Sequence, residues 1–364
     1  MTARNLNHSL LLGSSLLLGL GLSACSKPGA NFDALATGQS FQQNAVTVNN
    51  KIDILWVVDN SASMDPLQQN MVSNFNNFIQ NFQTKGFDYN MVVTTSDSYL
   101  AAPTYDNNPT LAAWRDGVGS ALSGFFYITP LIPNIVQNFV TNATQGALGS
   151  ADERAFSSIT AALSSPLNAG FPRAGSFFAV IILSDEDDFT DPNRPELSWI
   201  KGGLPDHDYA DTNLVTVNSM VSYLDNLTSS TPTNRHYNVS AISVLDSACQ
   251  ASHVAASPAT IVGQRYMQLV TDTNGILGSI CDSSYANSLN FIQQQIISLS
   301  SEFALSGSPN ASTIVVTVNG QTVPQSTTNG WTYIPASNTI QFTGSAVPSA
   351  SASISVAFQP SQLQ

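Results

Sequence analysis

Short apolar segments recur along the chain and predict strands that are buried on both faces. The segment 52–58 holds six apolar residues and one acid, and polar residues bound it on both sides. Runs of this length and composition are typical of buried strands. Similar runs lie at 87–95, 176–183 and 236–244. We therefore expect a sheet with several interior strands.

Segments in which apolar residues recur at helical spacing separate these strands. They lie at 66–85, 131–143, 152–164, 212–228, 260–272 and 285–301. The alternation of strands and helices predicts an α/β fold over residues 51–302, with a mostly parallel sheet covered by helices on both faces. The segment 96–149 is long and irregular, and we expect it to cover the top face of this domain.

The pattern changes near residue 304. Short strand-like runs follow at close intervals, at 314–318, 331–334, 339–342 and 353–358. Asn319-Gly320 after the first run is a strong signal for a tight hairpin turn. Short strands with turn residues between them predict a small antiparallel β domain over residues 303–364.

The N-terminus has the pattern of a targeting signal. Arg4 is followed by an apolar stretch at 10–22, which is too short for a membrane span of about 20 residues. Leu22-Ser23-Ala24-Cys25 resembles a bacterial lipobox, in which the cysteine becomes the lipidated first residue. We expect a signal peptide at 1–24, lipid on Cys25 and a flexible tether at 25–50. An ordinary secretory signal cleaved near Ala24 is the alternative.

The lipobox implies a bacterial cell-envelope protein anchored by lipid. Ser26 after the lipidated cysteine favours the outer membrane over the inner one, by resemblance to lipoprotein sorting. If Cys25 carries lipid, Cys249 and Cys281 are left as a pair in an oxidising compartment. We expect them to form a disulfide, with two buried free thiols as the alternative.

Charge excludes some classes of partner. The formal charge is −13, and loss of residues 1–24 removes only Arg4 from the charge count, which leaves −14. A strongly acidic chain argues against binding of nucleic acid, which requires clustered Lys and Arg. It also does not dock by charge onto anionic lipid head groups.

Candidate chemistry gathers where the first predicted strand ends. Asp59, Ser61 and Ser63 follow the segment 52–58 directly. One carboxylate and two hydroxyls form a hard oxygen cluster that suits Mg²⁺ rather than zinc. The same residue types also cap helices, which is the alternative. This Asp-x-Ser-x-Ser run after a strand resembles the metal-ion-dependent adhesion site (MIDAS) of von Willebrand factor type A (VWA) domains.

The VWA resemblance implies a doubly wound, Rossmann-like sheet and two further ligand loops. Asp185, which follows the strand at 176–183, matches the last ligand. The middle ligand is assigned to Ser150, with Thr144 as the alternative; Ser150 and Glu153 also have the spacing of a helix capping box. The remaining acids after this strand are a possible second cation site or supporting acids: Asp187, Asp188 and Asp191.

A cation held in this way leaves a coordination position open. The resemblance implies binding of a protein partner that offers an acidic residue to Mg²⁺, or to Mn²⁺ or Ca²⁺, and hence adhesion rather than catalysis. A metal-dependent hydrolase that uses Asp59, Asp185 and Asp187 is one alternative, and a purely structural metal is another. We expect no enzyme, because no activated nucleophile and no phosphate-binding loop is visible in the sequence.

Overall fold

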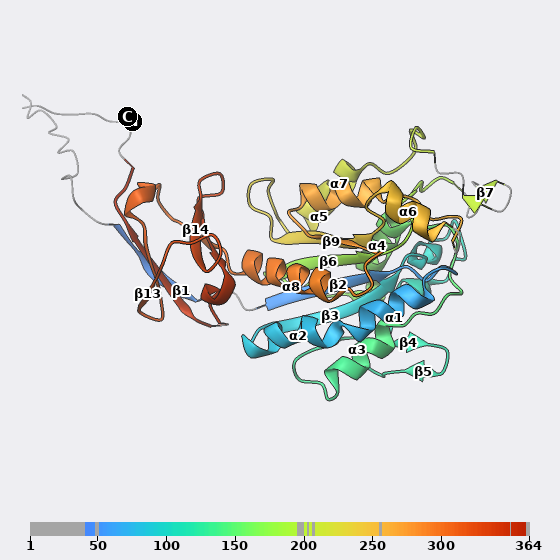
Figure 1. Cartoon of the computed structure of the whole chain (residues 1–364), viewed down its shortest axis with the longest axis horizontal. Coiled ribbons are helices and arrows are strands. Elements are labelled where there is room, and N and C mark those ends of the chain that lie inside the picture. Colours follow the sequence, from blue (N-terminus) through green and yellow to red (C-terminus); the bar gives the residue numbers. More distant parts are fainter. Residues whose placement is uncertain are drawn as a thin grey trace, which may run out of the picture. The chain divides into compact units, whose positions relative to one another are not determined.

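A five-stranded parallel sheet forms the centre of the larger α/β region (Figure 1). The computed structural model describes residues 41–47, 51–194, 200–201, 204–205, 208–254, 257–349 and 351–361. The sheet order is β10-β9-β6-β2-β3, and each neighbouring pair is parallel. Its strands are β2 (Lys51–Val58), β3 (Asp88–Thr95), β6 (Phe177–Leu183), β9 (Tyr237–Ser243) and β10 (Leu277–Ser279).

The strand order reverses direction at β2. The chain runs from β2 outward to β3 and then returns to the other side of β2 to form β6. Loops that leave β2 and β6 therefore diverge to opposite sides of the sheet. Open α/β sheets bind ligands at such a reversal, outside the carboxyl ends of the strands.

Helices cover both faces of this sheet. Along β2, Ile54 and Trp56 pack into one apolar cluster, whereas Leu55 and Val57 pack into another. The first cluster includes side chains of α1 (Asp65–Ser73), α2 (Phe75–Thr84), α3 (Ile135–Ala143) and α8 (Ala286–Ser300). The second includes side chains of α4 (Ala155–Ser164), α5 (Val217–Leu227) and α7 (Gln264–Asp272). The predicted α/β class, with a parallel sheet covered on both faces, is confirmed for the described residues.

Some element boundaries differ from those predicted. The helix expected at 66–85 is divided into α1 and α2 at Asn74, whose side-chain amide donates to the backbone oxygen of Asn70 (2.8 Å). Side-chain hydrogen bonds of this kind compete with continued helix. Strand β10 and helix α6 (Ser247–His253) were not predicted from the apolar pattern. The irregular segment 96–149 contains two short strands and two 3-10 turns before α3 begins.

The C-terminal part contains two antiparallel sheets. The four-stranded sheet has the order β1-β16-β12-β13, and the three-stranded sheet has the order β11-β15-β14. Asn319 and Gly320 between β12 and β13 both have positive φ, 50° and 78°, as the hairpin signal predicts. The strands are β1 (Phe41–Thr47), β11 (Phe303–Ala304), β12 (Val315–Val318), β13 (Gln321–Val323), β14 (Gly330–Ile334), β15 (Thr339–Thr343) and β16 (Ser353–Phe358).

Shorter elements complete the described chain. Two-residue strands pair as β4 (Gly117–Val118) with β5 (Ala121–Leu122) and as β7 (Ile200–Lys201) with β8 (Leu204–Pro205). The 3-10 helices are η1 (Ser98–Ala101), η2 (Pro109–Ala112), η3 (Pro166–Asn168), η4 (Ala311–Thr313) and η5 (Gly344–Ala346). Among the described residues, no helix is both long and apolar enough to span a bilayer.

The structure differs from the predicted tether at its far end. Strand β1 pairs antiparallel with β16, from Phe41 opposite Phe358 to Thr47 opposite Ser353. Its pairing partner lies some 300 residues along the chain, so no local pattern could reveal the strand. The predicted signal peptide, the lipidation site Cys25 and the rest of the tether lie outside the described residues.

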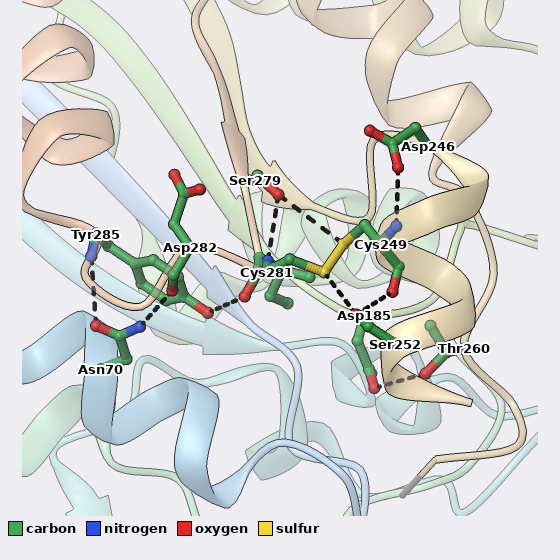
Figure 2. Close-up of a disulfide and its surroundings, with 11 residues drawn as sticks. Asn70, Asp185, Asp246, Cys249, Ser252, Thr260, Ser279, Cys281, Asp282 and Tyr285 are labelled. Carbon is green, nitrogen blue, oxygen red and sulfur yellow. Dashed lines mark hydrogen bonds between the residues drawn. A yellow bond between two sulfur atoms is a disulfide. The ribbon is translucent and has the colours of Figure 1, made fainter. Parts of the chain in front are cut away.

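The predicted disulfide is confirmed. Cys249 on α6 is bonded to Cys281, which follows β10, and their Cα atoms are 5.7 Å apart (Figure 2). The bond therefore joins the segment after β9 to the segment after β10, at the same end of the sheet as Asp185.

Removal of this disulfide is expected to lower the free energy of unfolding by about 2–4 kcal/mol, because a closed loop restricts the unfolded chain. The two cysteines are 32 residues apart in sequence. The double variant Cys249→Ser, Cys281→Ser can be compared with the oxidised protein by urea denaturation. An unchanged unfolding midpoint would show that the bond contributes nothing to stability.

Candidate metal site

Asp59 lies directly after β2 and is fixed beside the end of β6. Its backbone N–H donates to the carbonyl oxygen of Leu183 (3.0 Å), which extends the pairing of the two strands by one bond. Its carboxylate accepts hydrogen bonds from the Ser61 backbone N–H (2.8 Å) and the Ser184 hydroxyl (2.6 Å). The residue is only 1% exposed. Donors from both strand ends therefore hold this carboxylate in one orientation.

A series of hydroxyls links the first loop to Asp185. The Ser61 and Ser63 hydroxyl oxygens are 3.3 Å apart, and the Ser63 hydroxyl donates to the Asp185 carboxylate (3.0 Å). Thr260, in the loop before α7, donates to the other carboxylate oxygen (3.2 Å; Figure 2). The structure thus brings together the side chains of the first predicted loop and the acid at the end of β6.

The two carboxylates are in an environment that disfavours their charged form. Burial, and then repulsion from Asp185, raise the pKa of Asp59 to about 7, although hydrogen bonds from Ser184 and Ser61 oppose the rise. Burial also raises the pKa of Asp185, with hydrogen bonds from Ser63 and Thr260 acting against it. Among the described residues, no Lys or Arg forms an ion pair with either acid. Two buried acids without a basic partner, surrounded by hydroxyls, fit a hard divalent cation.

The middle loop is tied to the first loop through backbone contacts. The Gly149 N–H donates to the Asn60 carbonyl oxygen (2.8 Å). A Cβ atom at Gly149 would lie 2.4 Å from the Asn60 side chain, so a larger residue here would require that side chain to move. The next residue, Ser150, has its hydroxyl 3.2 Å from the Tyr99 hydroxyl. Ser150 is therefore one residue from a direct backbone contact with the first loop.

The predicted capping box is wrong. Helix α4 begins at Ala155 and not directly after Ser150, and the Ser150 hydroxyl accepts instead from the Asp152 backbone N–H (3.1 Å). The other candidate, Thr144, is the last residue of the α3 turn, and its hydroxyl donates to the Val140 carbonyl oxygen (2.8 Å). The Thr144 hydroxyl thus donates its hydrogen bond to a backbone carbonyl at the C-terminus of α3.

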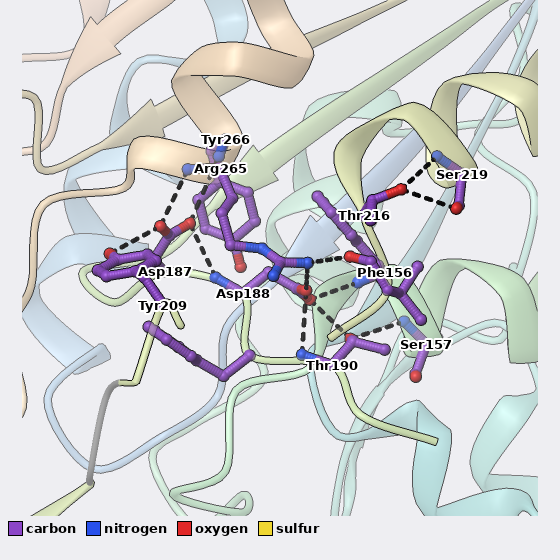
Figure 3. Close-up of polar contacts among 12 residues, drawn as sticks. Phe156, Ser157, Asp187, Asp188, Thr190, Tyr209, Thr216, Ser219, Arg265 and Tyr266 are labelled. Carbon is purple, nitrogen blue, oxygen red and sulfur yellow. Dashed lines mark hydrogen bonds and ion pairs between the residues drawn. The ribbon is translucent and has the colours of Figure 1, made fainter. Parts of the chain in front are cut away.

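The acids after Asp185 connect helices to the loop that follows β6 (Figure 3). Asp188 accepts hydrogen bonds from the Phe156 backbone N–H (2.8 Å) and the Thr190 hydroxyl (2.8 Å), and it forms an ion pair with Arg265 (3.2 Å). Asp187 accepts from the Arg265 backbone N–H (2.9 Å) and the Tyr209 hydroxyl (3.0 Å). These two acids cap α4 and α7 from outside the helices. Asp191 accepts from the backbone N–H of Asn193 (2.9 Å).

Replacing Asp188 with Asn is expected to lower the free energy of unfolding by about 1–3 kcal/mol, because the buried Arg265 loses its counter-charge. The affinity for Mg²⁺ is expected to stay within about twofold of the wild type, which is well under 1 kcal/mol. Chemical denaturation and calorimetry measure the two quantities. A large loss of cation affinity with unchanged stability would instead place Asp188 among the ligands.

Sequence reasoning did not find Ser184 and Thr260, the hydroxyls that bond the two acids. Ser184 directly follows the β6 run, so its position at a strand end was a usable signal. Thr260 comes from a loop whose position depends on tertiary packing. In the described ranges, no three His, Cys, Asp or Glu side chains converge closely enough to hold a metal ion together. The candidate set has two carboxylates, and its other oxygen atoms are hydroxyls.

Comparisons with known proteins give no family. No protein-family model matches the chain, and no curated protein matches it. Among solved structures, the pilus adhesin SpaC from Lactobacillus rhamnosus GG, in its open conformation, has a TM-score of 0.41 at 13% identity, over 88% of this chain and 40% of that chain. Proximal thread matrix protein 1 from the mussel byssus has a TM-score of 0.36 at 12% identity, over 72% and 51%.

A third structure is also similar to this chain only at a low TM-score and low identity. The three N-terminal domains of the type V pili tip protein Mfa5 from Porphyromonas gingivalis have a TM-score of 0.28 at 11% identity, over 88% of this chain and 63% of that chain. The chain thus spans 40% to 63% of the lengths of these three structures. Likenesses at these TM-scores carry no argument about function, which has to come from the site itself.

Proposed function

We propose that this chain is a lipid-anchored protein whose parallel-sheet region is a VWA-type domain. It binds a protein partner through a divalent cation at a MIDAS-like site made of Asp59, Ser61, Ser63 and Asp185. The observation that carries the proposal is the hydrogen bond from Ser63 to Asp185 (3.0 Å), which joins the loops after β2 and β6. The reversal of strand order at β2 supports it, because this is where such sheets bind ligands.

The residues present suit Mg²⁺, Mn²⁺ or Ca²⁺. The two carboxylates supply negative charge, and the two serine hydroxyls supply neutral oxygen ligands. When bound, the ion would supply an open coordination position that accepts a carboxylate from a partner. Ser184 and the Ser61 backbone orient the Asp59 carboxylate, and Thr260 orients that of Asp185. The middle loop, through Ser150, would complete the set directly or through water.

Contacts of Asp187 favour binding over hydrolysis. The hydrolase alternative uses this acid as a third metal ligand, but its carboxylate accepts from the Arg265 backbone and from Tyr209. A two-metal hydrolase needs carboxylates that bridge ions about 4 Å apart. Asp59 is the one acid of the first loop, and the other proposed oxygen ligands of this loop are the hydroxyls of Ser61 and Ser63.

The test is partner capture by the chain from Ser26 onward, immobilised and exposed to envelope extract. We expect proteins to be retained in Mg²⁺ and lost in EDTA, and Asp59→Asn to lose them in Mg²⁺ as well. Asp225→Asn is the matched control, because Asp225 makes its ion pair with Arg235 (3.0 Å) away from the proposed ligands. Retention that survives both EDTA and Asp59→Asn would contradict the proposal. Cation binding without cation-dependent capture would favour a structural metal.

Lipid anchoring has its own test, since Cys25 lies outside the described residues. The variant Cys25→Ser is expected to move from the membrane fraction to the soluble fraction, because lipid at this position is the proposed anchor. Fractionation followed by immunoblotting measures the distribution. A variant that stays entirely with the membrane would show that the anchor is elsewhere.

A further inference from the structure

Glu153 has a buried carboxylate and is not among the proposed cation ligands. It lies in the middle loop, just before α4, and is 1% exposed. Its backbone carbonyl accepts from the Phe189 N–H (3.1 Å), so the loop after β6 fixes its position. Neither carboxylate oxygen has a hydrogen-bond partner among the described residues. The Ser96 hydroxyl is near Glu153 and opposes the rise in its pKa. This hydroxyl donates its hydrogen bond to the Asn60 side-chain oxygen (3.5 Å).

The surroundings of Glu153 are acidic. After burial itself, repulsion from Asp59 and then from Glu186 contributes most to a pKa that is well above the usual range. Asp185 adds a smaller repulsion. The Glu153 carboxylate therefore belongs to the same acidic surroundings as Asp59, and backbone bonds of its loop reach both the first loop and the loop after β6. Burying a charged carboxylate without donors is strongly unfavourable, so this position requires a proton, a donor or a cation.

We infer that Glu153 is an outer-sphere ligand of the cation site: its carboxylate accepts hydrogen bonds from water molecules bound to the ion that Asp59 and Asp185 hold. This inference rests on the proposed function. A cation-bound water is a strong donor, and Mg²⁺ usually keeps several of its waters in proteins. Action through water also agrees with the absence of three converging acids in the described part of the chain.

This assignment gives the middle loop a clear role. The backbone bond from Gly149 to Asn60 brings the loop to the first loop, and the bond from Phe189 to Glu153 brings it to the third. Glu153 follows Gly149 by four residues and is itself the second of these two attachments. It adds a further negative charge to the surroundings of the ion, so it is expected to strengthen cation binding and to destabilise the cation-free protein.

The test is Glu153→Gln, which keeps the shape and removes the charge. Magnesium affinity is measured by calorimetry on the chain from Ser26 onward, and the melting temperature is measured in EDTA at pH 8. We expect Mg²⁺ affinity to fall about 10- to 100-fold, as for other outer-shell ligands. The cation-free melting temperature is expected to rise. A merely structural side chain would change the melting temperature without changing Mg²⁺ affinity.

The matched control is Glu302→Gln. Burial also raises the pKa of Glu302, to about 7, but this residue lies after α8 and bonds Gln341 (3.3 Å). It is expected to leave Mg²⁺ affinity unchanged. If Glu153→Gln does not fold, Glu153→Asp keeps the charge but retracts the carboxylate, and it should lower Mg²⁺ affinity without raising the cation-free melting temperature.

The outcomes separate this inference from the proposed function. If the wild type and Glu153→Gln bind Mg²⁺ with equal affinity, the role of Glu153 is overturned, but the proposed cation site is not contradicted. Wild-type protein that binds no Mg²⁺ overturns the proposed site, and the role of Glu153 with it. Weaker binding in both Glu153→Gln and Glu302→Gln would show a general electrostatic effect, which also overturns the specific role.

Discussion

Adding Mg²⁺ or Mn²⁺ to the cation-free protein is expected to raise its melting temperature at pH 8 and to change it little at pH 5. The reason is the protonation of Asp59. Its pKa is about 7 in the cation-free fold, so at pH 5 the carboxyl is protonated and a cation must displace the proton. At pH 8 the carboxylate is charged. A cation at about 100 times its Kd then adds about 2.7 kcal/mol of stability, which corresponds to several degrees.

The cation-free protein is expected to show the opposite trend with pH. The pKa of Asp59 is raised from 3.8 to about 7 on folding, so the folded state binds the proton more tightly than the unfolded state. The contribution of Asp59 to stability is therefore largest below pH 4, falls as pH rises toward 7 and is lost above that value. A shift of about three pKa units corresponds to a contribution on the order of 4 kcal/mol.

Differential scanning fluorimetry across pH 4–9, with Mg²⁺ and with EDTA, measures both trends. The difference between the two curves isolates the site, because other raised acids such as Glu302 contribute equally to each curve. Calcium and manganese can be compared in the same assay. Identical melting temperatures with cation and with EDTA at pH 8 would contradict a cation site at Asp59.

Asp59→Asn is expected to reduce cation affinity by at least about 100-fold and to stabilise the cation-free protein at pH 8. The amide removes a buried charge that repels Asp185, and it also removes the anionic oxygen that a hard cation prefers. Loss of one charged ligand corresponds to a binding free energy of roughly 3 kcal/mol or more. Loss of affinity together with a gain in stability is the signature of a residue that serves the ligand and not the fold.

The control for this variant is again Asp225→Asn. Asp225 is in an ion pair with Arg235 and accepts from Tyr237, so its neutralisation should lower stability slightly and leave cation affinity unchanged. If Asp59→Asn instead lowers the cation-free melting temperature, Asp59 acts mainly as a structural acceptor for Ser61 and Ser184.

The sequence predicts four of the five strands of the parallel sheet well because their runs are largely apolar and buried. Strands β2, β3, β6 and β9 all correspond to predicted runs. Strand β10 is three residues long, contains Gly278 and has no apolar run, so its assignment depends on its parallel partner β9. Strand β1 likewise depends on β16. Both were missed because pairing between distant segments, and not local composition, defines them.

The same distinction applies to the site. Asp59 and Asp185 were predicted from their positions at strand ends, and the parallel pairing of β2 with β6 accounts for their proximity. The burial of Glu153 and the contact of Thr260 with Asp185 could not be predicted, because each depends on where a loop packs. The Ser150 interpretation failed as a capping box because α4 begins at Ala155.

A shared cation site is tested most directly by a crystal structure with Mn²⁺ and measured anomalous scattering. We expect one Mn²⁺ peak shared by the ends of β2 and β6, with direct ligands among Asp59, Ser61, Ser63 and Asp185 at about 2.0–2.2 Å or through one water. The Glu153 carboxylate should lie within hydrogen-bonding distance of a water on that ion. Absence of a peak there at saturating Mn²⁺, or a peak only at other acids, would contradict the shared cation site.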